Sequence, residues 1–288
     1  MIPDSQKNLI VKEVEFLAKK MSQRVVANKA QASSATISQM IARNWEKISD
    51  NMWRKVQNNL RIDLYWRTAI NDNLKEIYYY CNSAQAQGLA ICIADHAGKG
   101  KSNGFKYYDR TNSNVIHLEC KASWTKKSFL KNMLIVMGVS PEGTFEDMLE
   151  TFNEQVKRME KPLLILDQAD KLKDPQLDLF MEFYNDHEGH LGIILSGVKA
   201  LEKRIDKGRQ RKKIGFAEIF SRFGSRYISI APICQADVQA ICEANGVEDQ
   251  EQIQMIYDTC GGDFRRVRRE IQKIHLSRTP NKELKLSA

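Results

Sequence analysis

The residues best suited to carry out chemistry form one short segment, Asp95-His96-Ala97-Gly98-Lys99-Gly100-Lys101-Ser102. Their spacing is that of the phosphate-binding pattern GxxxxGK[ST], with Asp95 at the first glycine position. Two glycines let backbone N–H groups approach a phosphate, and the N-terminus of a following helix favours an anion. We expect Lys101 to reach the β and γ phosphates of a nucleotide and the Ser102 hydroxyl to bind Mg²⁺. Asp95 is expected to be tolerated because aspartate adopts a left-handed backbone more readily than most residues.

A second motif lies downstream and supports the interpretation of the first. Four apolar residues, 163–166, end in Asp167, which is typical of a Walker B strand whose carboxylate holds Mg²⁺, usually through water. The next position normally carries glutamate in AAA+ ATPases, but here it is Gln168, a poor proton acceptor. Either hydrolysis is intrinsically slow, or the residue has been altered to trap the ATP-bound state. The alternative is that this segment is merely a buried strand end. Both motifs together predict an ATPase, weak or stimulated by a partner, with ATP and Mg²⁺ as cofactors.

Arginines follow in the order expected of an AAA+ module. Residues 220–226, FSRFGSR, come directly before the last expected strand, the usual place of an arginine finger. Arg222 is our first candidate to reach the γ-phosphate bound by a neighbouring subunit, and Arg226 is the second. Residues 261–266, GGDFRR, resemble a sensor-2 motif in which Arg265 faces the nucleotide. An ion pair at the surface is the alternative for either arginine.

The elements that must position these residues alternate along the chain. Apolar runs at 89–94, 115–120, 163–166, 191–195 and 227–230 predict five buried parallel strands, with helices between them at 125–138, 144–160 and 175–186. This alternation indicates an α/β sheet covered on both faces. We expect four parts: a helix-turn-helix module (1–60), a linker and helix (61–84), an AAA+ core (85–231) and a small all-α lid (232–288).

The first 60 residues read as short helices. Ser33 is expected to cap a helix whose apolar face includes Ile37 and Met40. The segment ANKAQASSATISQMI resembles the helix-turn-helix of phage repressors, although Gln31 stands where the turn usually carries glycine. In that motif the second helix enters the major groove, which implies DNA contacts from Thr36, Ser38 and Gln39. A helical bundle for protein contacts is the alternative.

Charge and composition narrow the remaining choices. The net charge is +8, and residues 199–226 hold ten Lys or Arg against three Asp or Glu. Such a strip suits a DNA backbone, with a solvated loop as the alternative. Six scattered cysteines without a CxxC pair argue against a zinc site. No long apolar run or secretory signal is evident, so we expect a cytoplasmic protein without a membrane contact. The candidate DNA contacts in the strip are Lys203, Arg204, Lys207, Arg209, Arg211, Lys212 and Lys213.

The combined order of these motifs resembles the AAA+ target-selection ATPases of transposition systems, the group of phage Mu B, TnsC, TniB and IstB. The anchors of the resemblance are ATISQMI, HAGKGKS, LLILDQADKL, LGIILSG and FAEIFSRF. It implies subunits joined head to tail into a helical filament on double-stranded DNA, which presents target DNA to a transposase. One rival is a replication initiator or helicase loader of the AAA+ class. The other is a helix-turn-helix regulator with an ATPase switch.

Overall fold

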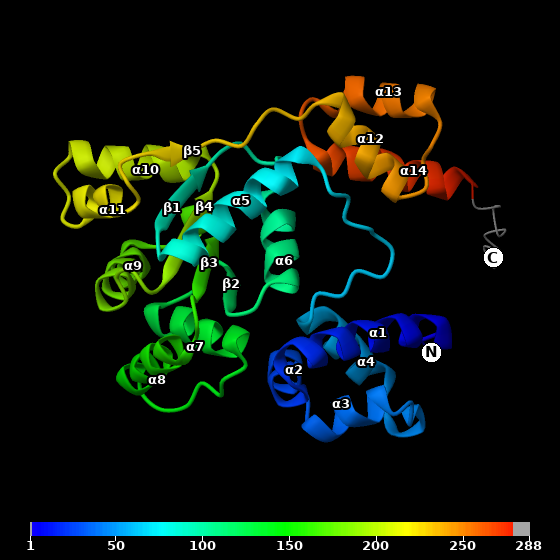
Figure 1. Ribbon diagram of the computed structural model, residues 1–288, viewed down its shortest axis with the longest axis horizontal. Coiled ribbons are helices and arrows are strands. Elements are labelled where there is room, and N and C mark those ends of the chain that lie inside the picture. Colours follow the sequence, from blue (N-terminus) through cyan, green and yellow to red (C-terminus); the bar gives the residue numbers. More distant parts are fainter. Residues whose placement is uncertain (1, 279–288) are drawn as a thin grey trace, which may run out of the picture.

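The computed structural model describes residues 2–278 and is built around one parallel sheet (Figure 1). The strand order is β2-β3-β4-β1-β5, and every neighbouring pair is parallel. The strands are β1 (Ala90–Ala94), β2 (Val115–Glu119), β3 (Leu163–Asp167), β4 (Gly192–Gly197) and β5 (Tyr227–Ile228). The predicted parallel α/β sheet is therefore confirmed.

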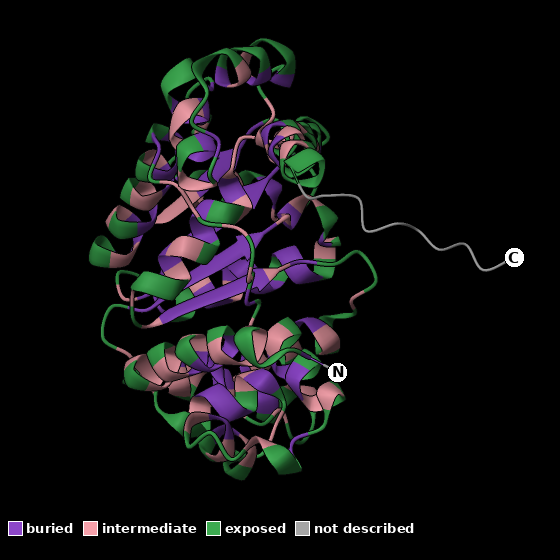
Figure 2. Ribbon diagram, turned by 90° about the vertical axis from the view of Figure 1, so that its right-hand side faces the viewer, coloured by how far each residue is buried: buried purple, intermediate pink, exposed green. Residues whose placement is uncertain are grey.

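Helices cover both faces of this sheet, so its strands are largely buried (Figure 2), which explains why most of their residues are apolar. One face packs against α5 (Asp72–Gln87) and α6 (Lys101–Thr111). The other packs against α7 (Lys126–Met137), α8 (Phe145–Arg158), α9 (Asp174–Asp186), α10 (Lys199–Gln210) and α11 (Phe216–Arg222). A 3-10 turn, η2 (Ala169–Lys171), follows β3. Much of the basic strip is thus helical, in α10 and α11, rather than an open loop.

The N-terminal helices have a hydrophobic core of their own. They are α1 (Asp4–Met21), α2 (Gln23–Ala30), α3 (Ser34–Ile41) and α4 (Asp50–Asn59), with a 3-10 turn, η1 (Trp45–Lys47), before α4. The turn between α2 and α3 passes through Gln31 at φ 52°, the left-handed conformation for which glycine is usually preferred. Ser33 caps α3 as expected, since its hydroxyl accepts a hydrogen bond from the Thr36 amide at 3.0 Å.

The N-terminal helices dock onto the core through α1 and α2. Arg110, at the C-terminal end of α6, pairs with Glu13 of α1 at 2.6 Å. Nearby, the Lys20 ammonium donates to the Asp109 carbonyl. On α2, the Asn28 amide donates to the carbonyl of Gly138, which ends α7, at 2.7 Å. Helix α6 therefore touches the N-terminal helices at the end opposite to the phosphate-binding segment.

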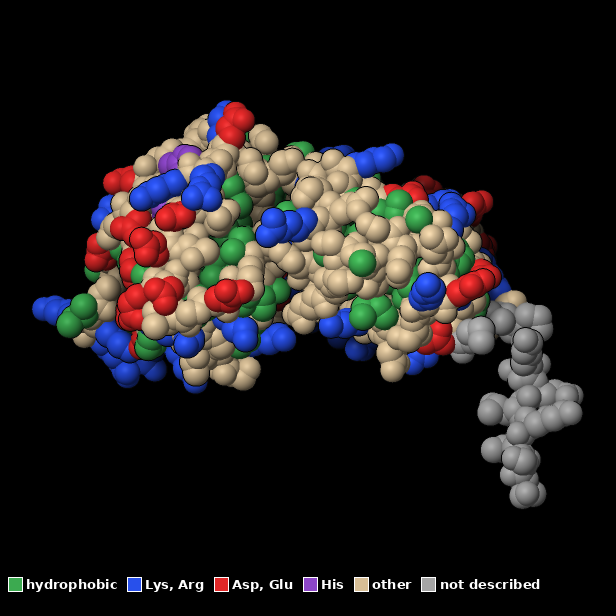
Figure 3. Space-filling view, turned by 90° about the horizontal axis from the view of Figure 1, so that it is seen from below, with side chains coloured by type: hydrophobic (Ala, Val, Ile, Leu, Met, Phe, Trp, Pro, Cys, Tyr) green, Lys and Arg blue, Asp and Glu red, His purple; other side chains and the backbone are tan. Residues whose placement is uncertain are grey.

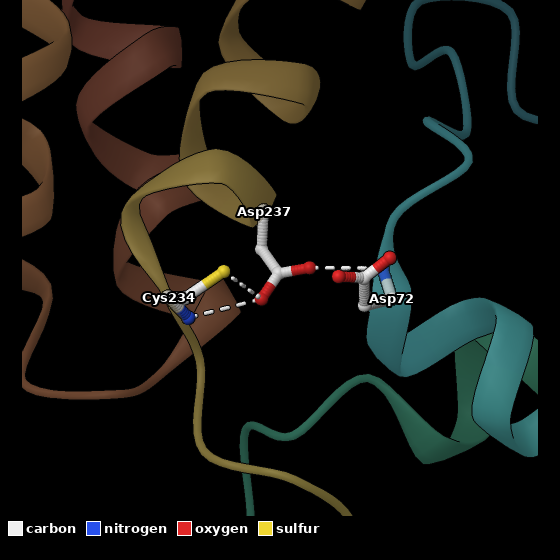
Figure 4. Close-up of side chains that lie close together, drawn as sticks. All are labelled: Asp72, Cys234 and Asp237. Carbon is white, nitrogen blue, oxygen red and sulfur yellow. Dashed lines mark hydrogen bonds between the residues drawn. The ribbon is translucent and has the colours of Figure 1, made fainter.

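Three C-terminal helices form a separate small cluster, as predicted for a lid. They are α12 (Gln235–Ala244), α13 (Gln250–Cys260) and α14 (Phe264–Arg278). The buried Asp237 links this cluster to α5, because one oxygen accepts from the Asp72 amide and the other from the Cys234 amide, both at 2.9 Å (Figure 4). Although these three side chains lie within 4.8 Å of one another at their ligand atoms, helix capping accounts for the arrangement.

The other cysteines, Cys81, Cys92, Cys120, Cys242 and Cys260, are buried. Within residues 2–278, no helix combines the length and the apolar character needed to cross a bilayer.

Candidate functional site

The phosphate-binding segment forms the loop between β1 and α6. Its two central glycines, Gly98 and Gly100, have φ of 87° and 85°, a region that disfavours side chains. A Cβ atom on Gly98 would lie 2.3 Å from the carboxyl carbon of Asp263, so the close approach of the lid also requires glycine there. Gly100 then caps α6, whose first residues are Lys101 and Ser102. The loop and the helix N-terminus thus have the form of an anion cradle.

Asp95, the departure from the usual pattern, is buried and holds the loop to the sheet. One carboxylate oxygen accepts from the His96 amide at 2.6 Å, and the other accepts from the Ile230 amide at 2.9 Å. Its backbone does not have a positive φ, so the left-handed explanation for Asp95 was wrong. Since β1 pairs with β5 at Cys92–Tyr227 and Ile93–Ile228, the carboxylate continues this pairing beyond the end of β5.

Lys101 lies folded over the loop. Its ammonium donates to the carbonyl oxygens of Asp95 and His96, both at 2.7 Å. Burial lowers the pKa of Lys101, while the carboxylates of Asp95 and Asp167 act in the opposite direction. The ammonium is therefore close to both acidic residues of the predicted site.

Asp167, at the end of β3, has the free oxygen that a metal ligand needs. One oxygen accepts from the Gln168 amide at 2.9 Å, whereas the other is buried and has no hydrogen-bond partner among residues 2–278. Burial raises the pKa of Asp167, but the adjacent His117 and Ser102 side chains outweigh it, so the pKa lies below its usual value. A charged carboxylate and a nearby hydroxyl are ligands that suit Mg²⁺. Asp167 and Ser102 therefore fit the predicted metal site.

Gln168 follows in a left-handed conformation, with φ 59°. Its side-chain oxygen accepts a hydrogen bond from the Lys171 ammonium. Asp170 links this turn to the tip of β4, because its carboxylate accepts from the Val198 amide at 3.1 Å. On β4, the Ser196 hydroxyl is fully buried and has no hydrogen-bond partner.

The lid contributes the predicted sensor arginine. The Phe264 amide donates to the Gly98 carbonyl at 2.9 Å, which fixes the start of α14 on the loop. Arg265, the next residue, is near enough to Lys101 to lower the pKa of its ammonium, after the larger effect of burial. Arg265 is exposed. The hydrogen bond from Phe264 to Gly98 therefore places Arg265 next to the phosphate-binding loop.

The two candidate arginine-finger residues lie elsewhere. Arg222, at the end of α11, pairs with Glu218 at 3.4 Å, and its guanidinium stacks 4.9 Å from the ring centre of Tyr184 on α9. Arg226 is exposed just before β5. Among the described residues, neither makes a hydrogen bond to the phosphate-binding loop of its own chain. Both belong to the α11–β5 region at the left of Figure 1.

The candidate DNA contacts divide into two groups. On α3, Ser38 is exposed, while Thr36 and Gln39 are half-buried. Seen from below, the lobe of N-terminal helices, on the right of Figure 3, is largely neutral with scattered Lys and Arg. In the basic strip, Arg204 and Lys213 both pair with Asp174, and Arg209 stacks 3.5 Å from the ring centre of Phe220. The exposed members that form no ion pair with another described residue are Lys203, Lys207, Arg211 and Lys212.

One residue near the metal ligands was missed from the sequence. His117 lies on β2 beside Asp167, with its Nε2 atom 4.0 Å from the free carboxylate oxygen. A histidine within a mostly apolar strand was the available signal, and that signal does not indicate which face the ring occupies.

Comparison with protein families matches residues 83–205 to the AAA domain. The chain contains an AAA domain. Such domains are P-loop NTPases that bind ATP, usually with Mg²⁺, and the match spans the loop, Asp167 and the sheet between them. Comparison with curated proteins gave no match.

Two solved structures align with part of this chain. The ORC1 protein of Aeropyrum pernix in complex with DNA aligns with a TM-score of 0.52 and 14% identity, over 76% of this chain and 64% of that chain. NtrX of Brucella abortus aligns with a TM-score of 0.47 and 14% identity, over 86% of this chain and 60% of that chain. The chain thus spans less than two thirds of either protein. At this identity, the likeness to ORC1 shows only that this chain and ORC1 have a similar fold.

Proposed function

We propose that this protein is an ATP-dependent, largely sequence-nonspecific DNA-binding ATPase that assembles head to tail and selects target DNA for a transposase. The observation that carries the proposal is that the Lys101 ammonium and the start of the lid helix, at Phe264, both make hydrogen bonds to one glycine-rich loop. The order of motifs along the chain supports the transposition role. Neither solved structure, at 14% identity, bears on that role.

The residues around the loop have separable tasks in nucleotide binding. Lys101 leaves the carbonyls of Asp95 and His96 to contact the β and γ phosphates. Ser102 and Asp167 would hold Mg²⁺, which when bound would neutralise charge on the phosphates. Arg265 faces the same anion from the lid. Because Phe264 is bonded to Gly98, nucleotide binding and lid position are directly connected.

Hydrolysis is slow unless a partner stimulates it. Gln168 has no carboxylate to accept a proton, and its side-chain oxygen is already bonded to Lys171. The ATP-bound state therefore persists long enough to support an assembly. Contact with the transposase is proposed to stimulate hydrolysis and release of DNA.

Assembly uses a different surface from the chain's own loop. Arg222 and Arg226 make no hydrogen bond to that loop among the described residues, which leaves them available for the γ-phosphate of a neighbouring subunit. A head-to-tail contact of this kind need not close, so repeated contacts generate a helical filament. The exposed Lys and Arg side chains of the basic strip, among them Lys203 and Lys207, then contact phosphates along the DNA backbone.

The test is electron microscopy of the full chain with ATP and random-sequence double-stranded DNA. We expect regular filaments that require ATP. Closed rings would favour a replication initiator or helicase loader instead. Complexes restricted to particular sequences would favour a helix-turn-helix regulator.

A further inference from the structure

His117 is a buried polar side chain whose ring makes no hydrogen bond within residues 2–278. Its side chain has no solvent exposure, and neither Nδ1 nor Nε2 has a hydrogen-bond partner in the described part of the chain. The ring packs edge-on toward Phe105 of α6, with the ring centres 6.0 Å apart. Most buried polar groups in folded proteins are paired, so an unpaired histidine at this depth requires an explanation.

His117 and Asp167 both have side-chain atoms without a hydrogen bond among the described residues, and these atoms lie near one another. The carboxylate of Asp167 has an oxygen that is 4.0 Å from Nε2 of His117 and that makes no hydrogen bond among the described residues. This distance exceeds that of a hydrogen bond by roughly 1 Å. The two residues come from neighbouring strands, since β2 pairs with β3 and His117 lies opposite Ile165.

We infer that His117 is a positioning residue for the metal-binding carboxylate. Its Nε2–H donates to the free oxygen of Asp167 when Mg²⁺ and nucleotide bind, while the Gln168 amide holds the other oxygen. Each carboxylate oxygen has a second lone pair, so these hydrogen bonds leave Asp167 able to bind the metal. Donors of this kind orient metal ligands, and their loss typically weakens metal affinity by 10–100-fold. The inference rests on the proposed nucleotide function.

The test compares four variants of the full chain. His117→Gln keeps an amide donor with a reach similar to that of Nε2, His117→Asn has the same chemistry but is one methylene shorter, and His117→Met removes the donor. His187→Met is the matched control, because His187 is also buried but bonds to Asn153 at 2.9 Å. The measurement is the Mg²⁺ concentration needed for half-maximal binding of a fluorescent ATP analogue, with binding in EDTA and thermal unfolding measured in parallel.

We expect His117→Met and His117→Asn to need roughly 10–100-fold more Mg²⁺. His117→Gln should stay close to the parent chain, and binding in EDTA should be unchanged in all variants. His187→Met should lower stability without changing the Mg²⁺ requirement. If His117→Met does not fold, the comparison of Gln with Asn decides the question.

Two results would overturn different parts of this account. An Mg²⁺ requirement that is the same in His117→Asn, His117→Gln and the parent chain would show that His117 is only structural. A parent chain that binds the analogue without any effect of Mg²⁺, or not at all, would instead overturn the proposed nucleotide function.

Discussion

The carboxylate of Asp95 accepts a hydrogen bond from the amide of Ile230, at 2.9 Å and across 135 residues of sequence. A glycine at position 95 could not make this bond. Because Asp95 begins the phosphate-binding loop and Ile230 lies shortly before the lid, the bond ties the loop to the chain that leads out of the sheet. It also pairs the amide of a residue that is only 3% exposed.

Asp95→Gly is expected to lower the free energy of unfolding by about 1–3 kcal/mol, the cost of leaving a buried amide unpaired. Asp95→Asn should lose less, because its amide oxygen can still accept one hydrogen bond. Urea unfolding of the nucleotide-free chain measures both, with the exposed Asp178→Asn as the control. An Asp95→Gly variant as stable as the parent would show that the bond to Ile230 contributes nothing.

Lys101→Ala should abolish ATP binding and ATP-dependent DNA binding while leaving the fold intact, because its ammonium is the cation nearest to the loop carbonyls. The measurement is the affinity for a fluorescent ATP analogue, with circular dichroism to check folding. Lys131→Ala, at an exposed position of α7, is the control. Unchanged affinity in Lys101→Ala would rule out the assigned phosphate site.

Gln168→Glu should raise ATP turnover. A positioned carboxylate that accepts a proton is worth at least about 2 kcal/mol of barrier, or roughly 30-fold in rate. Phosphate release at saturating ATP measures the effect, and Gln168→Ala should stay as slow as the parent. Brisk turnover by the parent chain would mean that another residue supplies the base.

The double variant Lys203→Glu, Lys207→Glu should weaken DNA binding to a similar extent on unrelated sequences. Each lost phosphate contact should reduce the slope of log affinity against log salt by roughly 0.9 for duplex DNA. Fluorescence anisotropy at several salt concentrations, with non-hydrolysable ATP, measures this slope. Lys131→Glu serves as the control for charge alone. If Ser38→Glu abolishes binding while the double variant has no effect, α3 is the DNA-binding element instead.

Asp174 predicts a specific dependence of stability on pH. Hydrogen bonds from Lys213 and Arg204 hold the pKa of Asp174 below its usual value. A carboxylate with a lowered pKa in the folded state stabilises the protein above its unfolded pKa of about 3.9, and this contribution disappears as the pH falls through the folded pKa. Asp174→Asn should therefore be less stable than the parent at pH 7 and equally stable in strong acid. Urea unfolding across this range checks the sign, and a constant difference at every pH would contradict it.

Local patterns predicted most of the fold. Apolar runs identified all five strands, and the hydroxyl of Ser33 identified the start of α3, because these signals lie within a few residues of the structure they determine. The phosphate-binding loop could be predicted for the same reason, because residues 95–102 are consecutive in the sequence. Gln31 was expected to disfavour its turn, yet it adopts the left-handed backbone in place of glycine.

The contacts between distant segments could not be predicted in this way. Nothing near Asp95 in the sequence indicates Ile230, and nothing near Gly98 indicates that Asp263 would pack against it. The pairing of Lys213 with Asp174 likewise joins residues 39 apart, and it removes a cation that composition alone counted as available. Such pairs depend on how the strands are ordered in the sheet, which a single sequence does not specify.

Helix α6 connects the phosphate-binding loop to the N-terminal helices. It begins with Lys101 at the nucleotide site and reaches Arg110, which is held by Glu13 of the N-terminal helices. Its 11 residues form a rod about 16 Å long between these two ends. A ligand that prefers one docking position of the N-terminal helices, and thereby shifts α6, changes the affinity for ATP. By thermodynamic linkage, ATP then changes the affinity for that ligand by the same factor.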